Sequence, residues 1–296
     1  MKISVIVPVY NDSRVESCIS SLLVQDYPKD LYEVIVVDNH SVASISEIIS
    51  RFPVTYLREE KQGSYFARNR GLETASGDIA AFIDADCVAD PGWLKNLVKG
   101  FEDPQVGGVG GKILKLPSKT WVQAAAEDLA EQQTSPQSLP FFPYPYIVTA
   151  NAAYRMSILR QLGGFDTQFQ SGGDVDLSGR VQQSGYQIIT VQDAIVYHAA
   201  RESIQGYFRQ YFGYAVGHTL LFKKYRHSMD RKFFVNTYPF RGLIMIPGRL
   251  IFRSALWLSG GALATTRGTE LLNLVKYIAL IGGNLYGSVK YRIPFL

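Results

Sequence analysis

Short branched apolar runs alternate with segments of helical periodicity over the first 86 residues, and this alternation constrains the fold more than any other feature. Residues 3–9 form a β-branched run that is apolar on both faces, as a buried parallel strand requires. Similar runs occupy residues 33–37, 54–57 and 79–83, with helical patterns between them. The order predicts an α/β fold with a mostly parallel, doubly wound sheet.

Polar residues follow three of these four runs. Asn11 follows the first, Asp38 and Asn39 close the second, and Asp84 and Asp86 follow the fourth. A polar loop end is common in any protein, but the carboxyl ends of parallel strands meet at one edge, where open α/β sheets bind ligands. The repetition over three strands therefore predicts a binding site at that edge.

Two of these carboxylates, Asp84 and Asp86, alternate across Ala85. This spacing lets both reach one divalent cation, and hard carboxylate oxygens suit Mg²⁺ or Mn²⁺ that also holds a diphosphate. The spacing alone is weak, because residues 174–176 repeat it. The stronger argument is the position of Asp84 and Asp86 directly after the apolar run at residues 79–83, since a carboxylate next to a buried run needs a cation or another partner.

These segments resemble glycosyltransferase family 2, nucleotide-sugar-dependent enzymes with the GT-A fold. The resemblance covers about residues 1–200, which we expect to form the catalytic domain. It rests on an ordered series of short blocks: Val5-Ile6-Val7-Pro8-Val9-Tyr10-Asn11, Val36-Val37-Asp38-Asn39, Ala67-Arg68-Asn69-Arg70-Gly71, Phe82-Ile83-Asp84-Ala85-Asp86, Asn151-Ala152-Ala153 and Gly172-Gly173-Asp174-Val175-Asp176.

The resemblance implies a binding site for a nucleotide-sugar donor. Tyr10 would lie against the base, Asp38 would accept a hydrogen bond from a pyrimidine imide N–H, and Arg68 would contact the ribose or the phosphates. A surface salt bridge is the alternative for Arg68. The implied donor-binding residues are Pro8, Tyr10, Asn11, Asp38, Asn39, Arg68, Asp84, Ala85 and Asp86.

The resemblance also implies a metal cofactor, Mn²⁺ or Mg²⁺, that neutralises charge on the departing diphosphate. Asp86, Asp84 and His198 are the expected ligands. An imidazole would make a carboxylate site more selective for ions like Mn²⁺. A histidine satisfied by backbone partners is the alternative for His198.

Asp174 is the expected general base, because the family places an acidic Glu-Asp pair near this point. Here Gly173 stands where the glutamate would be, so a like-charged neighbour is missing. We expect Asp176 to be mainly structural. Asn151 and Trp93 are expected acceptor-binding residues, with a buried amide and packing within its own helix as the respective alternatives.

Charge is divided unevenly along the chain. Residues 1–199 carry a net charge of −7 and residues 200–296 a net charge of +11. We expect residues 201–296 to form a helical, basic and apolar region that lies in the plane of an anionic membrane. Their apolar runs are shorter than the ~20 residues of a spanning helix. A helical subdomain or a dimer surface is the alternative, and no nucleic-acid partner is expected because the first part is acidic.

The cysteine content and the N-terminus bear on location. Two cysteines cannot make a disulfide framework, and the first apolar run lacks a signal-peptide cleavage site. We expect a cytoplasmic protein at the inner face of the cell membrane.

The sequence thus predicts an inverting, metal-dependent glycosyltransferase. A UDP-sugar is the expected donor, and a hydroxyl of a saccharide or lipid-linked saccharide is the expected acceptor. The alternative is a non-catalytic module that binds glycan or nucleotide on the same scaffold, and Gly173 is its support.

Overall fold

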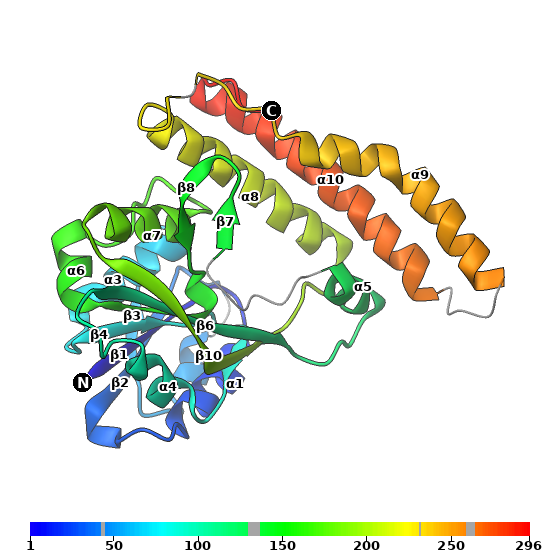
Figure 1. Ribbon diagram of the computed structural model, residues 1–296. Coiled ribbons are helices and arrows are strands. Elements are labelled where there is room, and N and C mark those ends of the chain that lie inside the picture. The colour runs from blue at the N-terminus through cyan, green and yellow to red at the C-terminus, as the bar shows by residue number, and fades with distance from the viewer. Residues whose placement is uncertain (43–44, 130–136, 231, 259–263) are drawn as a thin grey trace. The chain divides into compact units, whose positions relative to one another are not determined.

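The computed structural model describes residues 1–42, 45–129, 137–230, 232–258 and 264–296 (Figure 1). The chain divides into two compact units. The first comprises Met1–Leu114 and Gln132–His198, and the second comprises Lys115–Glu131 and Ala199–Leu296. The second unit thus takes in a short segment from the middle of the chain, which the change in composition near residue 200 did not indicate.

The first unit is built on an eight-stranded sheet with the order β3-β2-β1-β4-β9-β6-β10-β5. The strands are β1 (Ile3–Val9), β2 (Tyr32–Asp38), β3 (Thr55–Arg58), β4 (Ile79–Phe82), β5 (Cys87–Ala89), β6 (Val106–Lys115), β9 (Ala152–Arg155) and β10 (Gln187–His198). The first four pair in parallel, whereas β9 pairs antiparallel with β4 and β6, and β5 antiparallel with β10. The carboxyl ends of β1, β2 and β4 therefore share one edge, as predicted.

Helices cover both faces of this sheet. Val5 and Val7 lie in one apolar core with residues of α1 and α4, such as Ile19 and Leu94. Ile6 points to the other face, where a Cβ added to Gly71 of α3 would lie 2.6 Å from its Cγ2 atom. The helices of this unit are α1 (Val15–Leu23), α2 (Ile45–Ile49), α3 (Ser64–Thr74), α4 (Trp93–Lys99), α6 (Met156–Leu162) and α7 (Gly173–Gln183). The alternating side chains of β1 thus explain the doubly wound arrangement.

The glycine-rich segment at residues 107–111 is a strand that other atoms approach closely. A Cβ at Gly111 would overlap the Ala194 carbonyl oxygen and the Asn151 side-chain amide. A proline-rich segment lies further along the chain, at residues 137–146. Its described residues form an antiparallel pair, β7 (Gln137–Leu139) and β8 (Phe142–Tyr146). Both are edge strands, where proline is tolerated.

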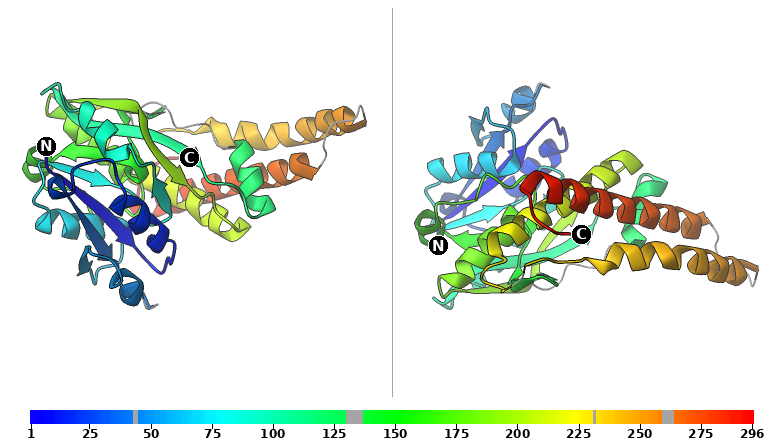
Figure 2. Two further views of the ribbon diagram at one scale, coloured as in Figure 1. Left: turned by 90° about the horizontal axis from the view of Figure 1, so that it is seen from below. Right: turned by 90° about the horizontal axis from the view of Figure 1, so that it is seen from above.

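The second unit is helical, as its composition predicts. It contains α5 (Trp121–Leu129), α8 (Ile204–Tyr225), α9 (Thr237–Leu258) and α10 (Ala264–Tyr291). α10 packs along both α8 and α9 (Figure 2). A small buried cluster that includes Val122, Tyr207 and Leu272 joins α5, α8 and α10. Among the described residues, no helix combines the length and apolarity needed to cross a bilayer.

Candidate active site

Two asparagines at the carboxyl edge of the sheet tie neighbouring loops together. The Asn11 N–H donates to Ser41 Oγ (2.9 Å), and Asn11 Oδ1 accepts from the Val42 N–H (2.8 Å). Asn39 donates from Nδ2 to the Lys61 carbonyl (2.7 Å) and accepts the Gly63 N–H at Oδ1 (2.7 Å). Both side-chain amides therefore shape the rim of the site, and their contact with a donor stays a prediction.

Asp38 and Tyr10 differ in their exposure to solvent. Asp38 is buried and accepts from the Ser41 N–H (2.9 Å) and the Tyr56 hydroxyl (3.1 Å), with Arg58 Nη1 at 3.3 Å. Tyr10 is 52% exposed. Pro8 lies before it in β1 and is half-buried. Tyr10 thus offers an open aromatic face, and Asp38 is a carboxylate that three donors hold in place.

Arg68 reaches from α3 to the loop after β4. Its Nη2 lies 2.6 Å from Asp84 Oδ1. The arginine is only 3% exposed, so this is not the surface salt bridge named as the alternative. Its guanidinium lies over the Tyr65 and Phe165 rings, at 5.5 and 5.9 Å from their centroids. The fold thus pairs the buried Arg68 guanidinium with Asp84, the first carboxylate of the Asp84-Ala85-Asp86 motif.

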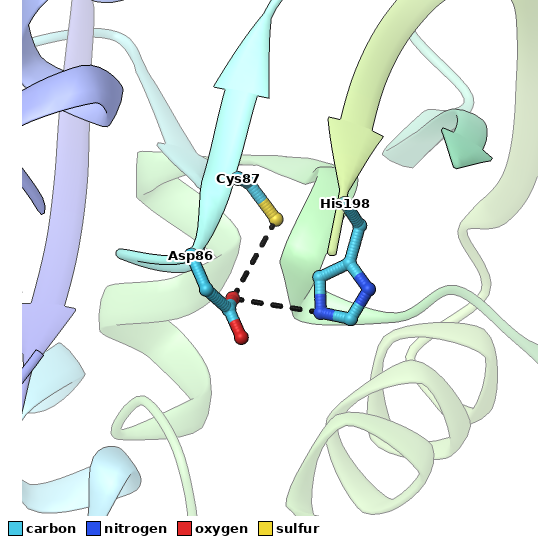
Figure 3. Close-up of side chains that lie close together, drawn as sticks. All are labelled: Asp86, Cys87 and His198. Carbon is cyan, nitrogen blue, oxygen red and sulfur yellow. Dashed lines mark hydrogen bonds and ion pairs between the residues drawn. The ribbon is translucent and has the colours of Figure 1, made fainter. Parts of the chain in front are cut away.

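The second carboxylate of that motif lies beside His198, as Figure 3 shows. Cys87 of β5 is paired with His198 of β10 across the sheet, which brings Asp86 next to the imidazole. Asp86 Oδ1 is 3.5 Å from His198 Nε2 and 3.9 Å from Cys87 Sγ. Ligand atoms of these three side chains lie within 4.8 Å of one another.

The donor chemistry of this group fits a divalent cation such as Mn²⁺. A carboxylate and an imidazole are ligands that such ions accept. Asp86 lies directly before β5 and His198 ends β10, which pairs with β5. Burial raises the pKa of the Cys87 thiol well above its ordinary value, and the Asp84 and Asp86 charges raise it further. The raised pKa disfavours the thiolate that a metal needs, so Asp86 and His198 are the stronger ligand candidates. Asp84 is outside this group of three, and its role as a ligand stays a prediction.

Arg14 is a residue of the site that the sequence did not single out. Its Nη2 lies 2.6 Å from Asp12 Oδ2 and 3.5 Å from Asp86 Oδ2. It thus adds a positive charge beside the second carboxylate of the motif. Its position three residues after Asn11 is a signal that could have been used, because that loop was already placed at the site edge.

Asp174 lies in the first turn of α7. Its Oδ1 accepts from the Val175 N–H (3.0 Å) and from the Tyr65 hydroxyl (3.4 Å). Burial raises the pKa of Asp174, the Arg68 charge lowers it in part, and Asp84 adds a smaller rise. A carboxylate with a raised pKa is a stronger base, which suits proton removal near neutral pH.

Asp176 has a different environment from Asp174. It is buried and forms an ion pair with Arg180 of the same helix, with 2.8 Å between Oδ2 and Nε. Arg180 also donates to the carbonyls of Leu162 and Gly164. The structural role predicted for Asp176 is confirmed.

Trp93 and Asn151 are placed in the interior. They are 0% and 1% exposed, and Trp93 Nε1–H donates to Asn151 Oδ1 (2.8 Å). Asn151 Nδ2 donates to the carbonyls of Lys112 (3.0 Å) and Ala194 (2.9 Å). Because neither side chain has a surface to offer, the expectation that they contact the acceptor is not met. The buried amide is the correct alternative for Asn151, whereas Trp93 packs in the sheet core against Asn151 and not only within its own helix.

Comparison with known proteins places the chain in a family. The family described as Glycosyl transferase family 2 matches residues 4–163. The Glycosyltransferase AglE of Haloferax volcanii is 34% identical over 206 residues, which span 67% of this chain and 67% of that protein. The dolichyl N-acetyl-alpha-D-glucosaminyl phosphate 3-beta-D-2,3-diacetamido-2,3-dideoxy-beta-D-glucuronosyltransferase of Methanococcus voltae is 24% identical over 239 residues, 75% of this chain and 74% of that protein.

Solved structures show the same fold. The mannosyltransferase PcManGT from Pyrobaculum calidifontis, in complex with GDP-Man and Mn²⁺, has a TM-score of 0.64 at 22% identity, covering 97% of this chain and 86% of its own. TarS of S. aureus (1–349), in complex with UDP-GlcNAc, has a TM-score of 0.56 at 21% identity, covering 73% and 66%. With the sheet order and the paired carboxylates described above, these findings establish that the chain is a glycosyltransferase of family 2 with the GT-A fold.

Proposed function

We propose that this protein is an inverting, metal-dependent glycosyltransferase that uses a nucleotide diphosphate sugar, with a UDP-sugar as the first candidate. One observation carries the proposal: α3 joins the two halves of the site. Arg68 pairs with Asp84 and the hydroxyl of Tyr65 contacts Asp174. Residues of one helix thereby hold both Asp84, a carboxylate of the proposed site for the sugar donor, and Asp174, the candidate base.

The donor would lie along the carboxyl edge of β1, β2 and β4. The exposed ring of Tyr10 offers a face for the base. Asp38 already has three donors, and a carboxylate has about four acceptor positions, so one remains for a base N–H. Pro8, Asn11, Asn39 and Ala85 would shape the pocket around these contacts.

Asp86 and His198 would hold Mn²⁺ or Mg²⁺, which would neutralise charge on the departing diphosphate. Arg14 supports the same end of the donor, because its guanidinium lies beside Asp86. In our proposal Asp84 contributes through its pair with Arg68 and through the ribose, in addition to its predicted place as a ligand.

Asp174 would take the proton of the acceptor hydroxyl. The oxygen then forms a bond to the anomeric carbon on the face opposite the diphosphate, and the bond from that carbon to the phosphate oxygen breaks. The configuration inverts because the entering and leaving oxygens lie on opposite faces. The raised pKa of Asp174, caused mainly by burial, supports this assignment.

The decisive assay follows release of nucleotide diphosphate from UDP-, GDP- and dTDP-sugars in the presence of Mn²⁺. We expect release with one donor class, and a product anomer opposite to that of the donor by NMR. Asp174→Asn should abolish transfer while calorimetry shows the donor still bound. No release and no binding with any of these donors would instead favour the non-catalytic binding module.

A lipid-linked saccharide is the acceptor class that we propose. The relative from Methanococcus voltae is named for a dolichyl-linked acceptor. The second unit of this chain also carries an apolar stripe on α10 at helical spacing. The stripe consists of Leu271, Leu274, Ile278, Leu285 and Val289, all exposed. With the excess of basic residues after residue 200, it would suit the surface of an anionic membrane at its inner face.

Flotation with vesicles of phosphatidylglycerol or phosphatidylcholine tests this second part. The wild type should float with the anionic vesicles, and the double variant Ile278→Asp with Leu285→Asp should not. Val24→Asp is the control, because Val24 is an apolar residue of the first unit that is more exposed than Ile278 or Leu285. Equal flotation of all three proteins, or none at all, would contradict the membrane proposal.

A further inference from the structure

The hydroxyl of Tyr65 makes two contacts at the start of α7. It accepts a hydrogen bond from the Gly173 N–H (2.9 Å) and donates one to Asp174 Oδ1 (3.4 Å). The ring is 5% exposed and stacks on Phe165, with 5.3 Å between centroids. Burial raises the pKa of Tyr65 well above its ordinary value, so the hydroxyl keeps the proton that it donates.

Gly173 provides the space that the Tyr65 ring occupies. A Cβ added to Gly173 would lie 2.7 Å from both Cε2 and Cζ of Tyr65, closer than packed carbon atoms come. Any side chain at position 173 would therefore push the ring, and its hydroxyl, away from Asp174. The residue that departs from the family's acidic pair thus has a matching partner 108 positions earlier in the chain.

We infer that Tyr65 is the positioning residue for Asp174, and that position 173 is glycine because it must admit the Tyr65 ring. This inference rests on the proposed function, in which Asp174 is the general base. The Tyr65 hydroxyl and the Val175 N–H both contact Oδ1 of Asp174, which assigns proton uptake to Oδ2. The two hydrogen bonds hold the carboxylate in one orientation before the acceptor arrives.

Tyr65 is not the only group that acts on Asp174. Arg68 of α3 favours the charged carboxylate, whereas Asp84 after β4 disfavours it. The hydroxyl is distinguished from these two because it contacts the carboxylate directly. Its removal should therefore change both the orientation of the base and the pH at which the base loses its proton.

The substitution Tyr65→Phe removes the hydroxyl and keeps the ring. We expect kcat to fall about tenfold, which corresponds to one hydrogen bond to a charged group, with donor Kd within twofold of the wild type. The acid limb of the kcat profile should move to higher pH, because a donor that favours the charged carboxylate is lost.

Tyr154→Phe is the matched control for that variant. The Tyr154 hydroxyl is also buried and also contacts α7, at Ser178 Oγ (3.1 Å), one helical turn after Asp174. This variant should lose stability and keep both kcat, within about twofold, and the acid limb. If Tyr65→Phe and Tyr154→Phe give the same kcat and the same acid limb, the positioning role of Tyr65 is overturned.

Gly173→Ala tests the second half of the inference. The added methyl should displace the ring and lower kcat in the wild-type background. In the Tyr65→Ala background the ring is gone, so Gly173→Ala should cause no further loss of kcat or of folded protein. An equal loss in both backgrounds would overturn the link between the two residues.

Donor turnover by the wild type and by Asp174→Asn distinguishes a failure of this inference from a failure of the proposed function. If the wild type turns over no donor, or Asp174→Asn keeps full turnover, the proposed function fails and the inference fails with it. If Asp174→Asn is inactive and Tyr65→Phe matches the wild type, the inference about Tyr65 alone fails.

Discussion

Arg68 Nη2 lies 2.6 Å from Asp84 Oδ1, in an ion pair whose arginine side chain is 4% exposed and whose carboxylate is 34% exposed. The Arg68 guanidinium is therefore buried in the interior, whereas the Asp84 carboxylate is partly exposed at the edge of the sheet. Tyr65 lies one turn earlier on the same helix and contacts Asp174. Residues three apart share a helix face, so one face of α3 contacts both Asp84, in the proposed donor site, and Asp174, the candidate base.

Loss of the Arg68 guanidinium should weaken donor binding. In Arg68→Met, Asp84 loses its partner and the buried ring pair loses its cation, so donor Kd should rise at least tenfold. The acid limb of the kcat profile should also move to higher pH, since Arg68 lowers the pKa of Asp174. Calorimetry and pH profiles measure the two effects. Arg70→Met, which removes an exposed ion pair with Glu73, is the control. Equal donor Kd for both variants would contradict the prediction.

Metal dependence should follow Asp86 and His198 but not Cys87. Asp86→Asn and His198→Ala should each raise the Mn²⁺ concentration for half-maximal activity by about tenfold or more, because each variant removes one of the two proposed metal ligands. Cys87→Ala should leave that concentration within about twofold, because burial raises the pKa of the thiol and so disfavours the thiolate that a metal needs. Titration of chelator-treated enzyme with Mn²⁺ gives the answer. A loss in Cys87→Ala as large as in His198→Ala would show that the thiol is a ligand.

The charge on Asp174 should cost stability above the ordinary carboxyl pKa of 3.8. Because burial raises the pKa of Asp174 in the folded state, the folded chain binds the proton more tightly than the unfolded chain. The free energy of unfolding therefore falls as pH rises from 3.8 through the raised value, and stays lower at neutral pH. Asp174→Asn should melt at a higher Tm than the wild type at pH 7, and the difference should shrink toward pH 3. A Tm difference that is the same at every pH would contradict this.

Asn151 should matter for folding and not for substrate. Asn151→Ala removes three hydrogen bonds: the one from Trp93 Nε1–H and those to the carbonyls of Lys112 and Ala194. We expect the free energy of unfolding to fall by about 2–4 kcal/mol, measured by urea titration. KM for donor and acceptor should stay within about twofold while the variant is folded.

The control for this prediction is Asn96→Ala. Asn96 donates to the Asp193 carbonyl and accepts from Lys99 Nζ, and both hydrogen bonds are exposed, so their loss should cost less than about 1 kcal/mol. A selective rise in acceptor KM for Asn151→Ala, without loss of stability, would restore the acceptor role.

The sequence by itself determined the strand and helix order of the first 86 residues, the edge that carries the polar residues, and the family. Those features are local, because periodicities of 2 and 3.6 residues and the ends of buried runs are readable without any partner. The tertiary structure decided which side chains meet. It joined Tyr65 to Asp174 across 109 positions, and it turned Trp93 and Asn151, 58 positions apart, toward each other in the core. Such pairings depend on how strands and helices pack, so no spacing within the chain encodes them.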